Sequence, residues 1–458
     1  MPPSVPIRRP PRMLLSAYAA SPIRGSESAV GWNRALQAAR FCDVWLICEE
    51  TEFGPEIREY LDRHGPIPGL EFVFVPMERT WRKLGNYSAF WYLALQQWQK
   101  KILGVARRLH SEIGFDLTHH LTFCGYREPG YLWQLDLPHV WGPIGGVQNH
   151  PYRFLAASGV SGALREGGRN LLNQLQFATS RRVRLAGQRS AAVIAANGEN
   201  RRGLERILRR HVSQMSDVGM VNSPDGQSQN FSPKCRAEHE PLRVLWSGWI
   251  TPNKALHLLL EATAIAAKQI PIEVTILGQG SEEASNRRLA ARLGIEGFCR
   301  FFGWRPHAEA LRCFEHTHCF AFTSLRDTTG TVLLEAMSRG APPICFDHQG
   351  ASELVTPSCG VKIEVTSPRR AASDLAAALV DLCQNNGKLR SLSLGAVNRA
   401  ADFTWEAQGD RMAKIYGQLI SPRRGELALR PELKEERLPP APLEEAETHE
   451  EMQEPVKW

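Results

Sequence analysis

The chain lacks several features that would assign it to a specialised class. Its ten cysteines include no C-x-x-C pair and no neighbouring histidine-rich tract, so neither a disulfide framework nor a zinc site is indicated. No apolar run is long enough to span a bilayer, and residues 1–12 have no apolar core behind them, unlike a secretory signal. Basic residues are not interleaved with aromatics in any recognisable nucleic-acid module. We therefore expect a cytoplasmic protein that binds no nucleic acid.

The net charge of +7 is divided unevenly along the 458 residues. Residues 426–458 hold ten acidic and four basic residues, a net charge of −6, so the remainder of the chain carries +13. This segment is rich in Glu and Pro and poor in apolar residues, which predicts a disordered acidic tail. The basic remainder suits an anionic partner, such as a nucleotide or the acidic inner face of the cytoplasmic membrane, where peripheral contact is expected.

Strand and helix patterns alternate in two successive series. Short apolar runs typical of buried strands lie at 13–18, 43–48, 71–76, 116–120 and 191–196, and then at 242–248, 272–278, 299–303, 319–322, 344–346 and 361–365. Segments with helical spacing lie between most of them. The two series predict an α/β protein with two Rossmann-like, doubly wound parallel-sheet domains. Ligands of such domains bind at the carboxyl ends of the strands, here in a cleft between the domains.

The domain boundaries follow changes in composition. We expect an N-terminal domain over residues 1–212 and a linker rich in Ser, Gly, Asn and Pro over 213–240. A C-terminal domain over 241–403 and a last helix within 404–425 complete the folded part, and the tail follows.

The predicted helix over 87–110 has two interpretations. It carries an aromatic side with helical spacing, including Phe90, Trp91 and Trp98, and basic residues near its carboxyl end. An amphipathic helix that lies on the sheet explains both features, because cations favour the negative end of the helix dipole. A helix that lies on a membrane surface is the alternative.

One strand, turn and helix carry the clearest chemical pattern. An apolar strand at 319–322 leads through a polar turn into a helix over 331–339. Unpaired N–H groups and the positive end of the dipole favour phosphate at such a helix start. Asp327 lies in the turn and Glu335 in the helix, and carboxylates accept hydrogen bonds from sugar hydroxyls. The pattern suits a ligand with phosphates and hydroxyls, although an ordinary α/β unit with a surface Asp and Glu remains the alternative.

The first half of the chain offers groups for the opposite side of a cleft. Gly25 lies between the first strand and its helix, in a corner of the phosphate-binding type. His119 and His120 are adjacent at a strand end, so they point to opposite faces and do not easily bind one metal, while one can face the cleft. Glycines in the turn 142–146 allow a ligand to approach the backbone.

These motifs together resemble glycosyltransferase family 4, whose members are retaining transferases with the GT-B fold. In the second half the match is Asp327-x7-Glu335 within LLEAM, followed by Gly340, Pro342 and the turn at Gly350. In the first half, pieces resembling one branch of the family are Gly25-Ser26-Glu27, His119-His120 and the turn ending at Gly145-Gly146. The resemblance covers roughly residues 12–420, and it implies that the helix within 404–425 packs back on the N-terminal domain.

The resemblance implies a donor site made of Gly25, Lys254, Trp304, Arg305, Asp327, Thr329, Gly330, Thr331 and Glu335. Glu335 would bind the ribose, Asp327 the hexose, the amides around Gly330 and Thr331 the diphosphate, and Trp304 with Arg305 the base. His120, Lys254 and Asp327 would be catalytic, with Lys254 neutralising the leaving phosphate. Gly25, Glu27, His119, His120, Gly145 and Gly146 would line the acceptor side of the cleft. No metal or other cofactor is implied, because positive groups replace magnesium.

Two positions depart from the family pattern. Trp249 stands where the family usually has Arg, and the loss of a charge-assisted partner of the diphosphate costs about 2 kcal/mol. Lys254, the helix terminus or Arg326 are candidates to compensate. Asp327 is one methylene shorter than the Glu that is common there, so the sugar or the loop must shift. We interpret this as a change in how the donor is bound and not as a loss of activity.

We therefore expect a retaining glycosyltransferase that moves a hexose from a nucleotide diphosphate sugar to a glycan or lipid-linked saccharide, in polysaccharide or glycoconjugate biosynthesis. Two alternatives stay open. One is a nucleotide-sugar epimerase on the same fold. The other is a catalytically silent sugar-nucleotide-binding protein, which Trp249 suggests.

Overall fold

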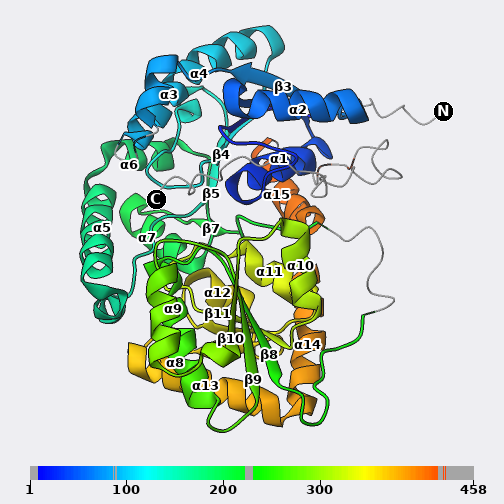
Figure 1. The fold of residues 1–458 in the computed structure, drawn as a ribbon. Coiled ribbons are helices and arrows are strands. Elements are labelled where there is room, and N and C mark those ends of the chain that lie inside the picture. Colours follow the sequence, from blue (N-terminus) through cyan, green and yellow to red (C-terminus); the bar gives the residue numbers. More distant parts are fainter. Residues whose placement is uncertain are drawn as a thin grey trace, which may run out of the picture.

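The computed structural model describes residues 9–85, 87, 90–221, 231–420, 427 and 429, without the side chains of Ser158 and Ser161. Two parallel sheets, one from each half of the chain, are each covered by helices on both faces (Figure 1). The predicted fold class is confirmed, because both halves are Rossmann-like. Apart from two residues, the expected acidic tail lies outside the described residues.

The N-terminal sheet has seven parallel strands in the order β3-β2-β1-β4-β5-β6-β7. These are β1 (Arg12–Ala17), β2 (Asp43–Glu49), β3 (Leu70–Val75), β4 (Leu117–Thr122), β5 (His139–Ile144), β6 (Ala192–Ala195) and β7 (Ser213–Gln214). The central strands are buried throughout, as expected for parallel strands with helices on both faces. Their order reverses between β1 and β4, and the crevice at that switch point opens at the carboxyl ends of the strands.

The helices of this half are α1 (Ser26–Ala39), α2 (Glu50–His64), α3 (Arg79–Gly85), α4 (Trp91–Ile113), α5 (Gly159–Thr179), α6 (Arg181–Arg189) and α7 (Gly198–Leu208). The boundary between α5 and α6 falls at Ser180, whose hydroxyl accepts a hydrogen bond from the Val183 amide and so caps α6. The aromatic side of α4 packs on the core: Trp91 and Trp98 are buried, and the Trp98 indole donates to the Val75 carbonyl at 2.8 Å. The alternative in which this side contacts a membrane is therefore wrong.

The C-terminal sheet has six parallel strands in the order β10-β9-β8-β11-β12-β13. They are β8 (Leu242–Ser247), β9 (Ile272–Leu277), β10 (Cys299–Gly303), β11 (Cys319–Phe322), β12 (Pro343–Phe346) and β13 (Val361–Ile363). The helices are α8 (Leu256–Ala266), α9 (Glu283–Arg292), α10 (His307–Glu315), α11 (Thr331–Ser338), α12 (Gln349–Leu354), α13 (Pro368–Gln384), α14 (Asn386–Ala401) and α15 (Trp405–Ile420). The switch point of this sheet lies between β8 and β11, whose loops carry Lys254 and Asp327.

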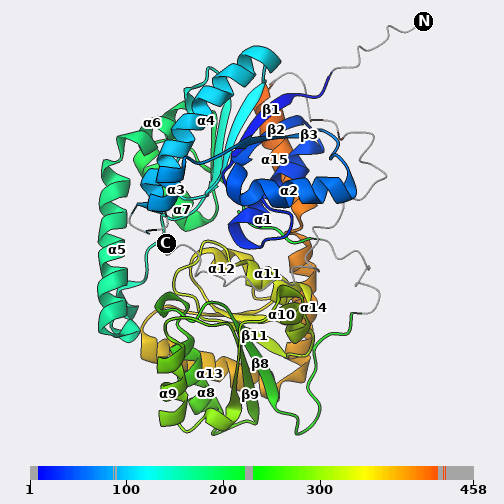
Figure 2. The same cartoon turned by 45° about the horizontal axis from the view of Figure 1, so that its top comes forward.

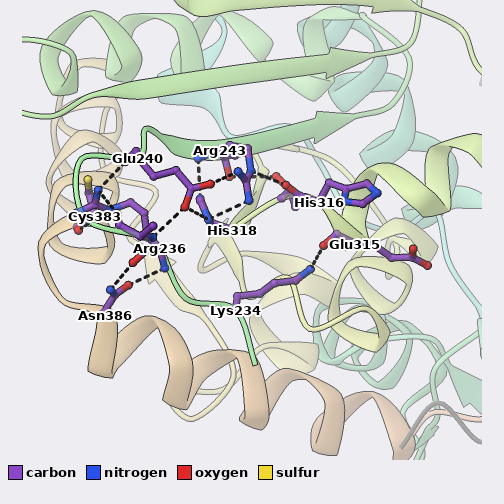
Figure 3. A network of polar contacts seen from close by, with 11 residues as sticks. Lys234, Arg236, Glu240, Arg243, Glu315, His316, His318, Cys383 and Asn386 are labelled. Carbon is purple, nitrogen blue, oxygen red and sulfur yellow. Dashed lines mark hydrogen bonds and ion pairs between the residues drawn. The ribbon is translucent and has the colours of Figure 1, made fainter. Parts of the chain in front are cut away.

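Much of the expected linker 213–240 belongs to one domain or the other. Its first two residues form β7. Residues 231–240 lie on the C-terminal domain, held by the polar network in Figure 3. There, the Arg236 guanidinium donates to the Cys383 carbonyl at 3.1 Å, and Asn386 bonds both the N–H and the carbonyl of Arg236. The Lys234 ammonium donates to backbone carbonyls at the end of α10. These bonds make residues 231–240 part of the C-terminal domain.

The last helix, α15, packs on the N-terminal half (Figure 2). Its partner there is α1: the Arg40 guanidinium at the end of α1 lies 3.0 Å from the Asp410 carboxylate of α15. Gly409 allows the two helices to lie close together, because a Cβ at this position would lie 2.8 Å from Gln37 of α1. The two segments that connect the halves lie side by side, since the Trp405 amide donates to the Met220 carbonyl at 2.9 Å. None of the described helices is both long and apolar enough to cross a membrane.

Candidate active site

The two halves touch at the loop between β11 and α11. Gln148 and Asn197 of the N-terminal half donate to the hydroxyl and the carbonyl of Thr328, at 2.8 and 2.7 Å. Gly145 faces the same residue, because a Cβ there would lie 2.8 Å from the Thr328 hydroxyl. The carboxyl ends of both sheets therefore meet at residues 327–330, where the sequence predicted the donor site.

Lys254 and Asp327, both predicted to be catalytic, form an ion pair with Nζ and Oδ2 separated by 2.5 Å. Each side chain is about a quarter exposed, so water and a ligand can reach the pair. The Lys254 ammonium also lies over the Phe322 ring, 5.6 Å from its centre, in a cation–π contact. The Lys254 carbonyl accepts from the Thr323 hydroxyl at 2.8 Å, which binds the two loops together at the switch point.

The start of α11 is built to receive an anion. Gly330 has a left-handed φ of +89°, and a Cβ there would lie 2.9 Å from the Phe322 ring, so glycine is required at this turn. No side chain caps α11, and the Leu333 amide already donates to the Gly330 carbonyl at 3.0 Å. The amides of Thr331 and Val332, at the very start of the helix, are the ones that can bind a ligand. The hydroxyl of the neighbouring Thr329 does not cap the helix, because it donates to the Asp217 carboxylate of the N-terminal half.

Glu335 lies one turn further along α11, with its carboxylate 3.0 Å from His307 Nε2. This hydrogen bond raises the pKa of His307 above its ordinary value. No sequence pattern pointed to His307, the first residue of α10, although it follows the loop that carries two predicted base contacts. Of these, Trp304 is 46% exposed and Arg305 lies 3.8 Å from the Glu309 carboxylate. The loop after β10 thus approaches the helix that holds the ribose candidate.

The N-terminal half contributes a second group of carboxyls. The Glu27 carboxylate accepts from the Cys124 amide at 2.6 Å, and its burial, with the charge of Asp217 added, raises its pKa to about 7. Burial also raises the pKa of Asp217, to which the charge of Asp327 contributes. Sequence reasoning missed Asp217, because it lies in the stretch assigned to the linker. Gly25 is exposed at the start of α1, which also has no side-chain cap.

The two predicted histidines lie in the interior of the N-terminal half. His119 bonds the Tyr416 hydroxyl at 2.7 Å and the Gly142 carbonyl at 2.6 Å. His120 bonds the Glu128 carbonyl at 2.9 Å through Nε2, and no described residue bonds its Nδ1. Burial lowers the pKa of His119 to about 3 and that of His120 to about 4, so both rings are neutral near pH 7. The structure does not bring either ring into hydrogen-bonding contact with the Lys254–Asp327 pair.

Arg326, a candidate to replace the missing family arginine, is engaged elsewhere. Its guanidinium lies 3.2 and 3.4 Å from the two carboxylate oxygens of Glu166 on α5. Burial alone would raise the pKa of Glu166. The charge and hydrogen bond of Arg326, together with the charges of Arg169 and His150, outweigh burial, so this pKa lies below its ordinary value. Trp249 is half-buried in the loop after β8. Three groups were predicted to compensate for the uncharged Trp249. Of these, Lys254 and the start of α11 lie where a diphosphate can reach them, while Arg326 is bound to Glu166.

The glycine-bearing turn after β5 lies against the same loop. Gly146 has a φ of +83°, and its amide donates at 3.0 Å to Gln148, which in turn bonds Thr328.

Within the part of the chain that the structure describes, no group of three or more His, Cys, Asp or Glu is placed to hold a metal ion.

Known proteins resemble this chain in both sequence and fold. Residues 227–393 match the family model described as glycosyl transferases group 1. The amylovoran biosynthesis glycosyltransferase AmsK of Erwinia amylovora is 30% identical over 202 residues, which cover 42% of this chain and 49% of that protein. The D-inositol 3-phosphate glycosyltransferase of Corynebacterium aurimucosum is 27% identical over 235 residues, which cover 47% of this chain and 55% of that protein. The chain thus spans about half the length of these two curated relatives.

The solved structures share the whole architecture. A structure of Anabaena Alr3699/HepE in complex with UDP and glucose has a TM-score of 0.56 at 17% identity, covering 89% of this chain and all of that one. WaaG, a glycosyltransferase involved in lipopolysaccharide biosynthesis, has a TM-score of 0.53 at 15% identity, covering 88% and 99%. The chain therefore has the GT-B fold, and the part that matches the family model of the group 1 glycosyl transferases is residues 227–393.

Proposed function

We propose that this protein is a retaining glycosyltransferase that moves a hexose from a nucleotide diphosphate sugar to a hydroxyl of a glycan or glycolipid acceptor. The Lys254–Asp327 pair beside the uncapped start of α11 carries the proposal. One cation, one carboxylate and a set of open amides meet there, where both sheets present the carboxyl ends of their strands. The matches to the group 1 family and to AmsK support transfer chemistry in polysaccharide or glycoconjugate biosynthesis.

Each side chain then has a defined task. The diphosphate accepts from the amides at the start of α11, while Glu335 accepts from the ribose hydroxyls. Asp327 accepts from hydroxyls of the hexose and so orients its reacting carbon. As the bond to the phosphate breaks, negative charge grows on the leaving oxygen, and Lys254 stabilises that charge more than it stabilises the ground state.

The ion pair of Lys254 and Asp327 holds a cation and a carboxylate side by side, where phosphate and sugar would each find an opposite or hydrogen-bonding partner. The N-terminal half then presents the acceptor hydroxyl from the side of Glu27, Gly145 and Gly146. The peptide backbone at Gly145 already lies against the donor loop.

A thermal-shift screen of nucleotide sugars tests the proposal first, because a ligand that binds only the folded state raises the melting temperature. UDP-glucose is the first candidate, since Alr3699/HepE has been solved with it. Nuclear magnetic resonance of the product then reports whether the anomeric configuration is kept. Absence of any stabilising nucleotide sugar would reject the proposal, and conversion of donor alone to an epimer would favour the epimerase.

A silent sugar-nucleotide-binding protein is the second candidate, because Trp249 replaces a family cation and Arg326 is held by Glu166. Binding of a donor with neither transfer nor slow hydrolysis would support it.

The positive charge of Lys254 and of the α11 start also leads us to propose that no metal is needed. We expect the rate of transfer to be unchanged by EDTA, measured at saturating donor. A loss of activity that magnesium restores would contradict this.

A further inference from the structure

Helix α5 turns its polar side toward the protein. Glu166 is buried and bonds Arg326 across the domain boundary. The buried Asn170 side chain bonds both the N–H and the carbonyl of His150, at 3.0 and 2.8 Å. The buried Asn173 amide donates to the Val147 carbonyl at 2.9 Å. This arrangement is the reverse of an ordinary surface helix, whose apolar stripe faces the core.

The apolar side of α5 is open to solvent. Val160, Leu164, Leu171 and Leu175 are 81, 74, 67 and 57% exposed. Their spacing of four, seven and four residues places them on one side of the helix. In Figures 1 and 2 this helix runs along the outer edge of the molecule, beside both halves. An exposed apolar stripe of this kind marks an interaction surface, because single-chain soluble proteins rarely leave one open.

An arginine-lined cavity of about 390 Å³ lies next to this stripe, between α5 and the start of α4. Arg127, Arg165 and Arg169 line it together with Tyr92 and Leu172. Leu172 is itself 58% exposed, so it joins the cavity to the apolar stripe. The cavity is therefore basic on one side and open to an apolar surface on the other.

The arginines of the cavity have no carboxylate partner within the described residues. Arg127 donates to the side-chain oxygens of Asn173 and Gln176, at 2.7 and 2.8 Å, which are both neutral. Arg165 forms no ion pair in the part of the chain that the structure describes, and Arg169 Nη1 is buried without a partner. Burial and the neighbouring arginines lower the pKa of Arg169 to about 9. The Glu166 carboxylate pairs with Arg326, and its charge also acts on Arg169. One carboxylate does not balance the three arginines of the cavity, which therefore keeps a net positive charge.

We propose that the apolar side of α5 and the adjoining arginine cavity dock the protein on an anionic lipid bilayer. The arginines receive the phosphate of a lipid headgroup, and the leucines enter the apolar boundary below it. Guanidinium groups suit this role because they bind phosphate oxygens in pairs. A second copy of this chain fits the surface less well, since packing α5 on α5 brings the unpaired arginines of both copies together. The proposal does not depend on transfer activity.

The docking surface also has a consequence for the candidate active site. Glu166 lies on the inner side of α5 and bonds Arg326, the residue before Asp327. A bilayer that contacts α5 is thereby brought beside the loop where both halves meet. An acceptor held in the bilayer would then need to extend only across the helix to reach the site.

Co-sedimentation with vesicles tests the docking surface in the full-length protein. Vesicles of phosphatidylglycerol mixed with phosphatidylcholine are compared with vesicles of phosphatidylcholine alone. We expect the wild type to bind the anionic vesicles more tightly by about tenfold or more, because each basic residue near an anionic surface contributes roughly 1 kcal/mol. The double variant Leu171→Ser/Leu175→Ser should bind both kinds of vesicle about tenfold more weakly, since it loses apolar area.

The variant Arg165→Gln/Arg169→Gln should lose the preference for phosphatidylglycerol. The controls Leu394→Ser and Ile265→Ser change exposed apolar residues of the C-terminal half and should bind like the wild type. Melting temperatures of all variants confirm that they are folded.

Three results would overturn the proposal. In the first, the wild type stays in solution with both kinds of vesicle. In the second, sedimentation without lipid shows a dimer that Leu171→Ser/Leu175→Ser dissociates, which would assign the surface to a second copy. In the third, inorganic phosphate raises the melting temperature of the wild type but not of the arginine variant, while vesicles fail to bind. That result would assign the cavity to a soluble anion.

Discussion

The two sides of the candidate site differ in how their functional groups are held. On the C-terminal side, the side chains of Lys254, Asp327 and Glu335 are about a quarter exposed. Lys254 pairs with Asp327, and Glu335 pairs with His307. On the N-terminal side, His119 and His120 are buried and satisfy backbone and side-chain partners within their own half. The difference teaches that a chemically suggestive residue on a central strand has competing uses in the core, whereas one in a loop after a strand has fewer.

The largest expected effect concerns the cation of the C-terminal side. Lys254→Ala removes the charge that we propose to stabilise the leaving phosphate, so turnover should fall by about 10²–10³. The affinity for free nucleotide, measured by calorimetry, should change much less. Lys268→Ala is the matched control, because Lys268 is exposed on the same half and lies outside the site. Equal losses of turnover and nucleotide affinity would make Lys254 a plain phosphate anchor.

The next effect concerns the ribose candidate. Glu335→Ala should weaken donor binding by about 10–100-fold, because a charge-assisted hydrogen bond contributes roughly 1.5–3 kcal/mol. Calorimetry with the nucleotide sugar measures the affinity, and Glu296→Ala, at an exposed residue before β10, serves as the control. Unchanged affinity in Glu335→Ala would remove Glu335 from the donor site.

A substitution on the N-terminal side should act on stability instead. His119→Phe keeps a ring of similar size but leaves the Tyr416 hydroxyl and the Gly142 carbonyl without their partner. We expect the free energy of unfolding to fall by about 1–3 kcal/mol in urea titrations. His211→Phe, at a ring that is 82% exposed, should change it little. A large loss of turnover in His119→Phe with unchanged stability would break the comparison and make this side catalytic.

The smallest effect is a pH dependence from Glu27. A carboxyl whose pKa is raised in the folded protein, here from 4.5 to about 7, contributes stability that is fully present below pH 4.5. That contribution is lost as the pH rises through about 7. The melting temperature of the wild type should therefore fall more between pH 4.5 and 8 than that of Glu27→Gln. Glu59→Gln, in an exposed ion pair on α2, should follow the wild type, and parallel curves for the wild type and Glu27→Gln would contradict the raised pKa of Glu27.

Local patterns in the sequence were sufficient for the architecture. Apolar runs bounded by turns predicted both parallel sheets, because strands covered by helices on both faces must be apolar throughout. The turn and helix around Asp327 were also readable, since phosphate affinity arises from the start of a single helix and glycine at position 330 is required locally. Strand β5 was missed because its Gly142-Pro143 pair indicates a turn. The short β7 and the helix α12 were missed because two-residue pairings and single helical turns leave little periodicity to detect.

Relations between distant segments were not readable in the same way. Asp217 reaches Thr329 across 112 positions, and its own surroundings in the sequence resemble a linker. His307 meets Glu335 only because α10 and α11 pack side by side. Trp91 and Trp98 of α4 and the leucines of α5 have similar helical spacing, yet the two tryptophans are buried and the leucines exposed. Spacing identifies the side of a helix that is apolar, but packing decides whether that side meets the core.

The sequence by itself determined the two Rossmann-like domains and the strand, turn and helix that carry Asp327 and Glu335, because these depend on interactions between residues close together in the chain. The tertiary structure decided the partners: it paired Lys254 with Asp327, tied Arg326 to Glu166, and placed both histidines in the core. It also left the apolar side of α5 uncovered. The physical reason is that charge pairing and burial depend on distance in space, which the chain sets only when both sheets have packed.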